Sequence, residues 1–521
     1  MCQRCRNAAE TNLRSLDFPH RWLGEFIGEA KKRAAFEWAQ TLSPQMFAAA
    51  SFEGFPVGEW VLSSIISYFR KYPPDLADWN VANVYRGFLF SAALVCIGLS
   101  EYLDRHPVDA ALLFNGRQSI TRVALEIFRR REIRVLTHER AEYVPGHINI
   151  KPNAHCMNPD PFQAYWEAWS GVPLDRKALQ ETLRWLTQRR YGLNMAWIAF
   201  NSSAKLTPLT RSNFRSRPDR RLWVLFTSST DEVAADPLMQ GPYDSQISWV
   251  RDVISWIVSR DDIDLIVKVH PNIAGNEYIG EAASELNIYR DLKATSAPNV
   301  RIILPEESVN SYSLAEEADV GLTFGSIIGL EMAMLGKPVL LASRAVYEAG
   351  KYFIRVPSKA LLESCLEQCL QSYDSRAIRR EAFRLAYYYA FRFEPPFPAV
   401  KVLGLYTAEP NPSYNQRLVD PETDSLSRIC NYLVNGASLF DSPSAADLSR
   451  RTKDEDTFFS HLERLPGNLR NVRYEYSLRL QSLAHAAGTG LRRLPFGIGD
   501  AVLRLGRPTW RAFLGAVEDI G

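Results

Sequence analysis

Apolar positions in the first hundred residues recur at helical spacing, most regularly through residues 22–38 and 60–69. After residue 108 the pattern changes to short apolar runs that alternate with helical segments. The run 109–114 (DAALLF) is followed by helical spacing through 123–130 and then by the run 133–137 (IRVLT). Two strand–helix steps of this kind predict a parallel sheet. Doubly wound domains usually open on a strand, so we expect a helix-rich first domain whose opening strand is missing.

The same alternation returns in a stronger form in the second half of the chain. Residues 205–221 (KLTPLTRSNFRSRPDRR) are polar, basic and interrupted by prolines, which is typical of an interdomain linker. Helical segments then separate short apolar runs at 222–226, 265–269, 300–304, 320–324 and 338–341. Buried runs of this length joined by helices predict a doubly wound parallel sheet.

The end of the chain departs from this alternation. A helix is expected over 376–392, the stretch 442–456 is polar, and the segment 491–520 places arginines among apolar residues at helical spacing. We therefore predict an α/β protein with two Rossmann-like doubly wound domains and an extra helical C-terminal region. The expected boundaries are 1–205 for the first domain, 206–221 for the linker, 222–440 for the second domain and 441–521 for the extension.

Bulk properties narrow the class of protein. The 521 residues carry 61 Lys and Arg against 59 Asp and Glu, a net charge of +2, which gives no reason to expect a nucleic-acid partner. Seven scattered cysteines argue against a disulfide framework and favour a reducing cytoplasm. The longest apolar run, 87–99, is shorter than the roughly 20 residues that span a bilayer, so it predicts a buried helix.

Polar residues follow four strands of the second domain at the point where each strand is expected to end. Ligands in open parallel sheets bind outside the carboxyl ends of the strands. We therefore expect these residues to face one crevice and to bind a ligand there. The residues at the four strand ends are Thr227, Ser228, Ser229, His270, Pro271, Glu306, Gly325 and Ser326.

The segment 323–338 (TFGSIIGLEMAMLGKP) carries the most specific signal in the chain. Ser326 is a natural N-cap, and the closing Gly-Lys-Pro is a natural helix stop. Gly325 and Gly329 have no side chain to keep a ligand from the backbone. The N–H groups at such a helix start suit a phosphate, and Glu331 could accept hydrogen bonds from ribose or sugar hydroxyls. A well-capped helix with glycines for tight packing is the structural alternative.

His270 closes the run DLIVKVHP and is expected at the same edge of the sheet. An imidazole there can donate to a phosphate oxygen as a sugar–phosphate bond breaks, which makes His270 a candidate catalytic residue. A lone histidine at a strand end is more often structural. The capped helix two strands later is what favours the catalytic interpretation.

Together these motifs resemble the capsule polysaccharide biosynthesis family, which includes Kdo transferases of the two-domain GT-B type. The resemblance covers about residues 105–435 and rests on Lys268-Val269-His270-Pro271, Ala318-Asp319-Val320 and the segment 325–338. In that family the His-Pro and Ser-rich motifs hold the phosphate of the donor nucleotide, which implies the same roles for His270 and Ser326. Nucleotide-sugar epimerases share the Gly/Ser–Glu–GKP pattern. The missing opening strand and the long C-terminal region depart from the family and leave the acceptor side open.

A polar triplet also follows each predicted strand of the first domain. The two triplets, Asn115-Gly116-Arg117 and His138-Glu139-Arg140, resemble the same family. Glu139 is the candidate catalytic base for an acceptor hydroxyl, because it directly follows a strand. Asn115, Arg117 and Arg140 are candidates for binding the acceptor or an anionic sugar, since a guanidinium fork matches a carboxylate. The structural alternative is an ion pair of Glu139 with Arg117 or Arg140. Two weaker candidates for the base are Asp231 and Glu232.

Neither a metal nor a cofactor is expected. A metal-dependent transferase would place an Asp-x-Asp sequence at the carboxyl end of a strand, but the one at Asp262 and Asp264 precedes its strand, about 20 Å from the carboxyl edge at strand rise. We interpret it as a solvated turn at the wrong end of the sheet. The nucleotide sugar then enters as a substrate, and catalysis is expected to be metal-independent.

We therefore predict a GT-B-like glycosyltransferase that moves a sugar from a nucleotide-sugar donor to a growing bacterial surface glycan of capsule or lipopolysaccharide type. The acceptor would be a glycan or a lipid-linked glycan. The enzyme alternatives are a nucleotide-sugar 2-epimerase and a polyol-phosphate transferase. The alternative of another class is a non-catalytic GT-B-like scaffold subunit of a polysaccharide assembly complex.

The segment 491–520 leaves two interpretations of the location open. Its apolar residues either pack on the body of the protein or lie on an anionic inner membrane, as amphipathic basic helices do. Glycines and a proline divide the segment into short pieces, which weakens the membrane interpretation. We expect a cytoplasmic protein, with peripheral contact to the inner membrane in the second case.

Overall fold

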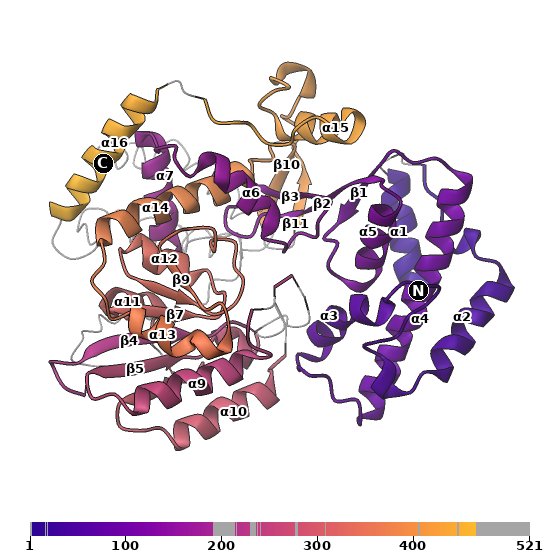
Figure 1. Ribbon diagram of the computed structural model, residues 1–521. Helices are drawn as coiled ribbons and strands as arrows, with labels where there is room; N and C mark the ends of the chain where they lie inside the picture. Colours follow the sequence, from indigo (N-terminus) through magenta and orange to yellow (C-terminus); the bar gives the residue numbers. More distant parts are fainter. Residues whose placement is uncertain are drawn as a thin grey trace, which may run out of the picture.

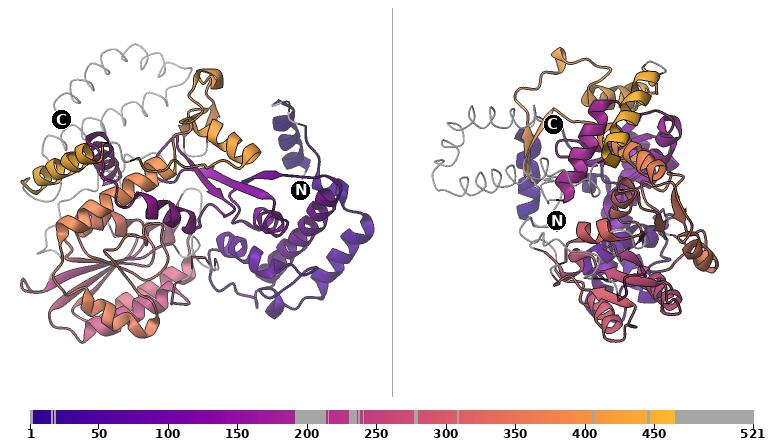
Figure 2. Two further views of the ribbon diagram at one scale, coloured as in Figure 1. Left: turned by 45° about the horizontal axis from the view of Figure 1, so that its top comes forward. Right: turned by 90° about the vertical axis from the view of Figure 1, so that its left-hand side faces the viewer.

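The computed structural model describes residues 3–190, apart from 16 and 18, and residues 214–464, apart from 215, 230–235, 237, 240, 277–279, 308, 405–406 and 445–446. Within these residues the chain forms a helical lobe that carries a small sheet and a second lobe built on a large parallel sheet (Figure 1). Two further views show the lobes side by side, with the small sheet running from the helical lobe toward the other (Figure 2). The predicted α/β class is confirmed.

The helical lobe is organised around one long helix, α4 (Trp79–Arg105), which contains the apolar run 87–99. By length and composition α4 could cross a membrane, but 56% of its most apolar window is buried inside the structure. It packs against α2, α3 and α5 and is the core helix of this lobe. The other elements here are α1 (Gln3–Ser15), η1 (Leu23–Phe26), α2 (Glu29–Thr41), η2 (Pro44–Met46), α3 (Val57–Phe69) and α5 (Ser119–Arg130).

The small sheet contains one parallel pair and one antiparallel strand. β1 (Ala110–Phe114) and β2 (Arg134–Arg140) are parallel and are connected by α5, whereas β3 (Ile148–Pro152) runs antiparallel to β2. Pairing with β3 extends β2 to Arg140, so Glu139 lies in the strand rather than after it. This corrects the predicted strand end at residue 137. The first domain thus keeps one strand–helix–strand unit of the Rossmann pattern, and its described residues before β1 form helices and turns.

The large sheet has six parallel strands in the order β6-β5-β4-β7-β8-β9. The chain moves outward from β4 to β6 and then returns to the other side of β4 for β7 to β9. This is the strand order of a doubly wound Rossmann sheet, with the reversal between β4 and β7. All five predicted strands are present, and the sixth, β9, was not predicted. The bounds are β4 (Arg221–Phe226), β5 (Ile263–Lys268), β6 (Val300–Ile303), β7 (Val320–Thr323), β8 (Val339–Leu341) and β9 (Phe353–Arg355).

Helices cover both faces of the large sheet (Figure 1). Along β4, Leu222, Val224 and Phe226 face one apolar core, and Trp223 and Leu225 face the other. Burial on both faces explains why each strand is a continuous apolar run. The first core is shared with α11 (Ser311–Glu317), α12 (Ile328–Met334) and α14 (Ser375–Tyr387). The second is shared with α9 (Gln246–Val258), α10 (Ala283–Ala294) and α13 (Leu362–Gln368).

The chain crosses between the two lobes in both directions. α6 (Asp160–Trp169) and α7 (Arg176–Arg190) follow the small sheet in sequence, yet they pack with α14 and its π-helical continuation η7 (Tyr388–Phe393). Conversely, α15 (Ser425–Asn435) follows the elements of the second lobe in sequence but packs on β1 and β2 of the small sheet. The remaining elements are η5 (Pro271–Ala274), η6 (Lys359–Leu361), η8 (Gln416–Leu418) and the hairpin of β10 (Val400–Gly404) and β11 (Thr407–Pro410).

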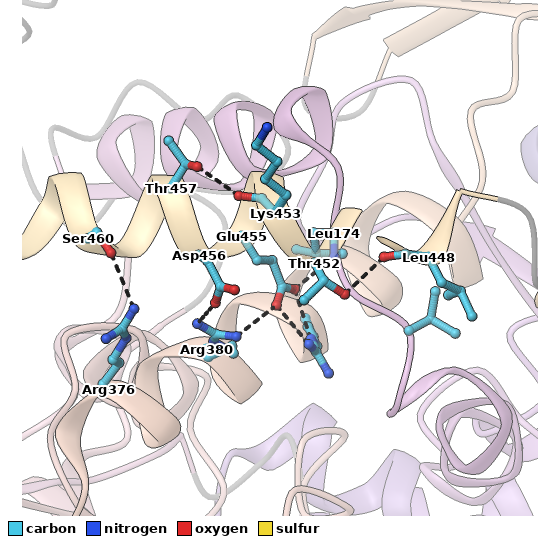
Figure 3. A network of polar contacts seen from close by, with 12 residues as sticks. Leu174, Arg376, Arg380, Leu448, Thr452, Lys453, Glu455, Asp456, Thr457 and Ser460 are labelled. Atoms are coloured by element: carbon cyan, nitrogen blue, oxygen red, sulfur yellow. Dashed lines mark hydrogen bonds and ion pairs between the residues drawn. The ribbon is translucent and has the colours of Figure 1, made fainter. Parts of the chain in front are cut away.

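Part of the predicted C-terminal extension, α16 (Leu448–Arg464), packs on the body of the protein (Figure 3). Glu455 of α16 is fully buried and accepts hydrogen bonds from Arg384 Nε at 2.8 Å and from Leu174 N at 2.7 Å. Beside it, Arg380 donates to Asp456 at 2.6 Å. Most of the predicted linker, 206–213 and 215, and the tail 491–520 lie outside the described residues.

Candidate functional site

The predicted donor residues lie at one edge of the large sheet. β5, β4 and β7 are adjacent and parallel, so their carboxyl ends meet at the same edge. Thr227, Ser228 and Ser229 follow β4, His270 follows β5, and Ser326 follows β7 soon after Thr323. The strand order reverses between β4 and β7, which is where open α/β sheets form their ligand crevice.

Hydrogen bonds join the loops after β4 and β5 into one cluster. His270 N donates to Thr227 Oγ1 at 2.8 Å, and Asn272 Nδ2 donates to Ser229 Oγ at 3.2 Å. We call these residues, together with Ser228, the edge cluster. Four members of the edge cluster are buried, and His270 is the partly exposed one.

Ser228 occupies a distinct position within the edge cluster. Its backbone N–H donates to Gln246 Oε1 at 2.6 Å, and its carbonyl accepts from Gln246 Nε2 at 3.0 Å. The first residue of α9 therefore clamps the main chain at the end of β4. The Ser228 hydroxyl is buried and has no hydrogen-bond partner among the described residues. Because a buried hydroxyl without a partner is costly, this atom is the one in the edge cluster best suited to gain from a ligand.

The ring of His270 is oriented by its own loop. Pro271 starts η5, and His270 Nδ1 accepts a hydrogen bond from Asn272 N at 3.1 Å. A neutral imidazole that accepts at Nδ1 carries its proton on Nε2. The hydrogen bond from Asn272 N therefore fixes the orientation of the ring at the carboxyl edge of the sheet.

The segment 323–338 differs in detail from its predicted cap. α12 starts at Ile328 with Ile327 as N-cap, so Ser326 precedes the cap, and this helix is only 7 residues long. The Ser326 carbonyl accepts from Tyr347 Oη at 2.6 Å and from Gly329 N at 3.1 Å, which turns the chain before the helix begins. A side chain at Gly329 would collide with the Tyr347 hydroxyl. Tight packing against Tyr347 is therefore reason enough for that glycine.

Two carboxylates that were predicted to bind the donor substrate, Glu331 and Glu306, lie outside the edge cluster. Glu331 is buried, forms an ion pair with Arg189 of α7, and accepts from Tyr312 Oη at 3.0 Å. Glu306 is on the surface, with its side chain 53% exposed, 4.0 Å from Arg290 Nη2. A ribose hydroxyl could reach Glu331 only if Arg189 moved.

In the first domain, the predicted base and its neighbours are close together. Asn115 has a left-handed backbone at φ +59° and donates from Nδ2 to Glu139 Oε2 at 2.9 Å. Asn115 Oδ1 accepts from Arg117 N at 2.9 Å, and the Arg117 side chain is buried. Arg140 ends the same strand as Glu139. The other two candidates for the base, residues 231 and 232, lie outside the described residues.

An unpredicted contact joins this region to the second domain. Asp236, from the segment between β4 and α9, is buried with its Oδ2 3.2 Å from His155 Nε2. Burial alone would raise the pKa of Asp236, but the hydrogen bond to His155 and the charges of His155, Arg117 and Arg122 outweigh it and lower that pKa. Both residues lie outside regular elements, so no periodic pattern in the sequence pointed to them.

A second unpredicted residue, Arg70, reaches the edge cluster from the helical lobe. Its guanidinium donates to Ser229 Oγ at 3.1 Å, to Asn272 O at 2.9 Å and to Gly280 O. Arg70 and Gln246 also line a pocket of about 420 Å³ between residues 70–76 and the first turns of α9 and α10. Nothing in the sequence around Arg70 distinguishes it from an ordinary surface arginine.

The Asp-x-Asp sequence is structural, but it is not a solvated turn. Asp264 is buried and accepts from Ser216 N at 2.7 Å and from Arg220 Nη1 at 3.0 Å. Asp262 pairs with Arg260 at 3.0 Å. These pairs fasten the start of β5 at the amino edge of the sheet, opposite the edge cluster.

Comparisons with known proteins give distant structural likenesses. No family model matches the chain, and no curated protein is similar to it in sequence. One similar structure is KpsC of Thermosulfurimonas dismutans, a beta Kdo 2,4 transferase, with 16% identity, a TM-score of 0.34, and 53% of this chain and 78% of that chain covered. The UDP-GlcNAc 2-epimerase of Methanocaldococcus jannaschii is 14% identical, with a TM-score of 0.27 and 63% and 96% covered. The spinosyn rhamnosyltransferase SpnG is 10% identical, with a TM-score of 0.28 and 66% and 79% covered.

Proposed function

We propose that the chain is a metal-independent glycosyltransferase that transfers a sugar from a nucleotide-sugar donor to an acceptor hydroxyl. The observation that carries the proposal is the edge cluster, in which the loops after β4 and β5 hold the His270 ring at the strand reversal of a doubly wound sheet, where Nε2 would donate to a phosphate oxygen. The buried Ser228 hydroxyl lies at the end of the central strand, β4, and provides a second donor. Phosphate oxygens are the ligand atoms that such a set of donors matches best.

In the proposed reaction the acceptor oxygen forms a bond to the anomeric carbon while the bond from that carbon to the donor phosphate breaks. The electron pair of the broken bond stays on the phosphate oxygen, where His270 Nε2–H stabilises the charge. Glu139 takes the proton of the acceptor hydroxyl as general base. Asn115, which donates to Glu139, holds that carboxylate in place, and Arg117 and Arg140 bind an anionic sugar or acceptor.

The finer assignment rests on the motif resemblance to the capsule polysaccharide family. On this assignment, the acceptor is a bacterial surface glycan of capsule or lipopolysaccharide type, free or lipid-linked. The reaction then takes place on the cytoplasmic side of the inner membrane. Contact with the membrane would run through residues 491–520. Binding of anionic vesicles by the full chain but not by a version ending near residue 488 would support that contact, and equal binding by both would exclude it.

A scaffold without catalytic activity is the second candidate, because Glu331 is already paired with Arg189. A thermal-shift panel of CMP, UDP, GDP and CDP separates the two. A nucleotide that occupies its site at 100 times its dissociation constant should stabilise the fold by about 2.7 kcal/mol. Stabilisation by one nucleotide, lost in His270→Ala, supports the transferase. No stabilisation by any of the four supports the scaffold.

A further inference from the structure

The backbone at Arg70 is unusual for an arginine. Arg70 is the C-cap of α3 and has a left-handed conformation, at φ +50° and ψ +40°. Glycine and asparagine are the common residues at such helix ends, and a longer side chain is disfavoured there. The cap itself needs only the backbone N–H, which bonds Ile66 O at 2.7 Å. The cap therefore does not explain why this residue is an arginine, and the explanation lies in the contacts of its side chain.

That side chain crosses from the helical lobe into the second domain. It is only 8% exposed, and its acceptors are Ser229 Oγ, Asn272 O and Gly280 O. These acceptors belong to two connections at the carboxyl edge of the large sheet, Ser229 after β4, and Asn272 and Gly280 after β5. One guanidinium thus fastens the first domain to the loops that follow β4 and β5.

Asn272 connects this contact to His270. Its carbonyl accepts from Arg70, its side chain donates to Ser229, and its backbone N–H donates to His270 Nδ1 at 3.1 Å. A shift of Asn272 would release the ring nitrogen that fixes the orientation of the imidazole.

We propose that Arg70 is a positioning residue that sets the ring orientation of His270 through Asn272 and so couples the pairing of the two domains to the donor site. The proposal rests on the proposed function for its catalytic consequence, but the coupling between Arg70 and His270 can be measured without any activity. Because Arg70 lines the pocket of about 420 Å³, a small soluble guanidinium should be able to replace its side chain.

The test compares Arg70→Gly with Arg105→Gly, the same change at the end of α4, where the arginine is 58% exposed. Glycine accepts the left-handed backbone, so Arg70→Gly should fold. With histidine labelled at Cε1, the NMR signal of His270, assigned by its loss in His270→Gln, should move in Arg70→Gly and return with methylguanidinium. It should not move in Arg105→Gly. An unmoved signal in folded Arg70→Gly, or an equal shift in both variants, would overturn the proposal.

Kinetics provide the second readout, with the donor that the nucleotide panel indicates. In Arg70→Gly, kcat should fall about 10- to 100-fold, as expected for a misplaced catalytic group, while the donor KM changes little. Methylguanidinium should restore kcat. A rise in KM alone, or no rescue, would contradict positioning.

Should Arg70→Gly fail to fold, Arg70→Lys takes its place, and an unmoved His270 signal there overturns the proposal. A wild-type protein without transfer activity would refute the proposed function, whereas the NMR comparison would still decide on Arg70.

Discussion

His270 is held at the edge of the large sheet mainly through backbone groups. Its N–H is bonded to Thr227 Oγ1, and its Nδ1 to the N–H of Asn272. The sequence predicted the position of His270, because a strand end can be read from a local apolar run. It could not predict Asn272 or Arg70 as its support, because those contacts depend on how distant segments meet.

Replacing His270 should therefore impair chemistry more than folding. His270→Ala should lower kcat about 10²- to 10³-fold, the usual loss when a donor to a developing negative charge is removed. The free energy of unfolding should fall by less than about 1 kcal/mol, because His270 is partly exposed at the strand end and its ring accepts a neutral hydrogen bond from Asn272 N. Steady-state kinetics and denaturant unfolding measure the two, with His461→Ala on the exposed side of α16 as control. Equal losses of activity and stability would make His270 structural.

The proposed role of His270 also predicts metal independence. If His270 and Ser228 stabilise the charge on the departing phosphate, excess EDTA should leave the rate within about twofold of the untreated enzyme, since hydrogen-bond donors can supply this stabilisation. Initial rates with and without EDTA test this. Activity that EDTA abolishes and magnesium or manganese restores would show that a cation, rather than the edge cluster, stabilises the charge on the departing phosphate.

At the scale of elements, strands were easier to predict than helix starts. The strands of the large sheet are buried on both faces, so each is a continuous apolar run bounded by polar residues. The start of α12 is set instead by the Tyr347 hydroxyl, which lies 21 residues beyond the Ser326 carbonyl that it binds. A cap that depends on such a distant partner leaves no local signal.

The attachment of α16 gives a prediction at this scale. Glu455→Gln removes the charge that pairs with Arg384, whose own side chain is only 16% exposed. Breaking a buried pair on one side costs about 3–5 kcal/mol, so the free energy of unfolding should fall by that order. Asp456→Asn, one residue along and 53% exposed, is the matched control and should cost less than about 1 kcal/mol. Comparable costs in the two variants would mean that Glu455 is not what holds α16.

For the whole molecule, two buried charged residues, Lys151 and Glu394, lie where the first sheet meets η7 of the second lobe. Lys151 of β3 lies with Nζ 4.3 Å from the ring centre of Phe393, at the end of η7. Burial lowers the pKa of Lys151 to about 8. It raises the pKa of the adjacent Glu394 to about 8, and the charge of Lys151 opposes that rise. Both shifts require the two lobes to be packed together.

These shifts predict a minimum in stability near pH 8. Folded Glu394 keeps a proton that the unfolded chain releases above pH 4.5, so stability falls between pH 4.5 and about 8. Unfolded Lys151 keeps a proton up to pH 10.5 that the folded chain has lost, so stability rises again between about 8 and 10.5. Each group contributes at most about 1.4 kcal/mol per pH unit. Thermal unfolding across this range should show the dip in wild type, and the double variant Lys151→Met, Glu394→Gln should be flatter. A dip of equal depth in both would assign it to other groups.

The arrangement of the two lobes was the part least accessible from sequence. The contacts between them run through Arg70, Asp236 and the crossing helices α6 and α7, whose local patterns are those of ordinary surface loops and amphipathic helices. The sequence predicted two strands in the first domain, with the opening strand missing. It did not predict the antiparallel strand β3. β3 follows β2 after only a short turn, and antiparallel pairing is what so short a connection allows.

The most direct test of the account is a crystal structure of the full chain with the nucleotide that stabilises it best. We expect a phosphate oxygen within hydrogen-bonding distance, about 2.7–3.2 Å, of His270 Nε2, with a second phosphate contact to Ser228 Oγ. The nucleotide should lie at the carboxyl edge of β4, β5 and β7. A nucleotide bound at the amino edge near Asp262 and Asp264, or wholly within the helical lobe, would contradict the assignment of the donor site.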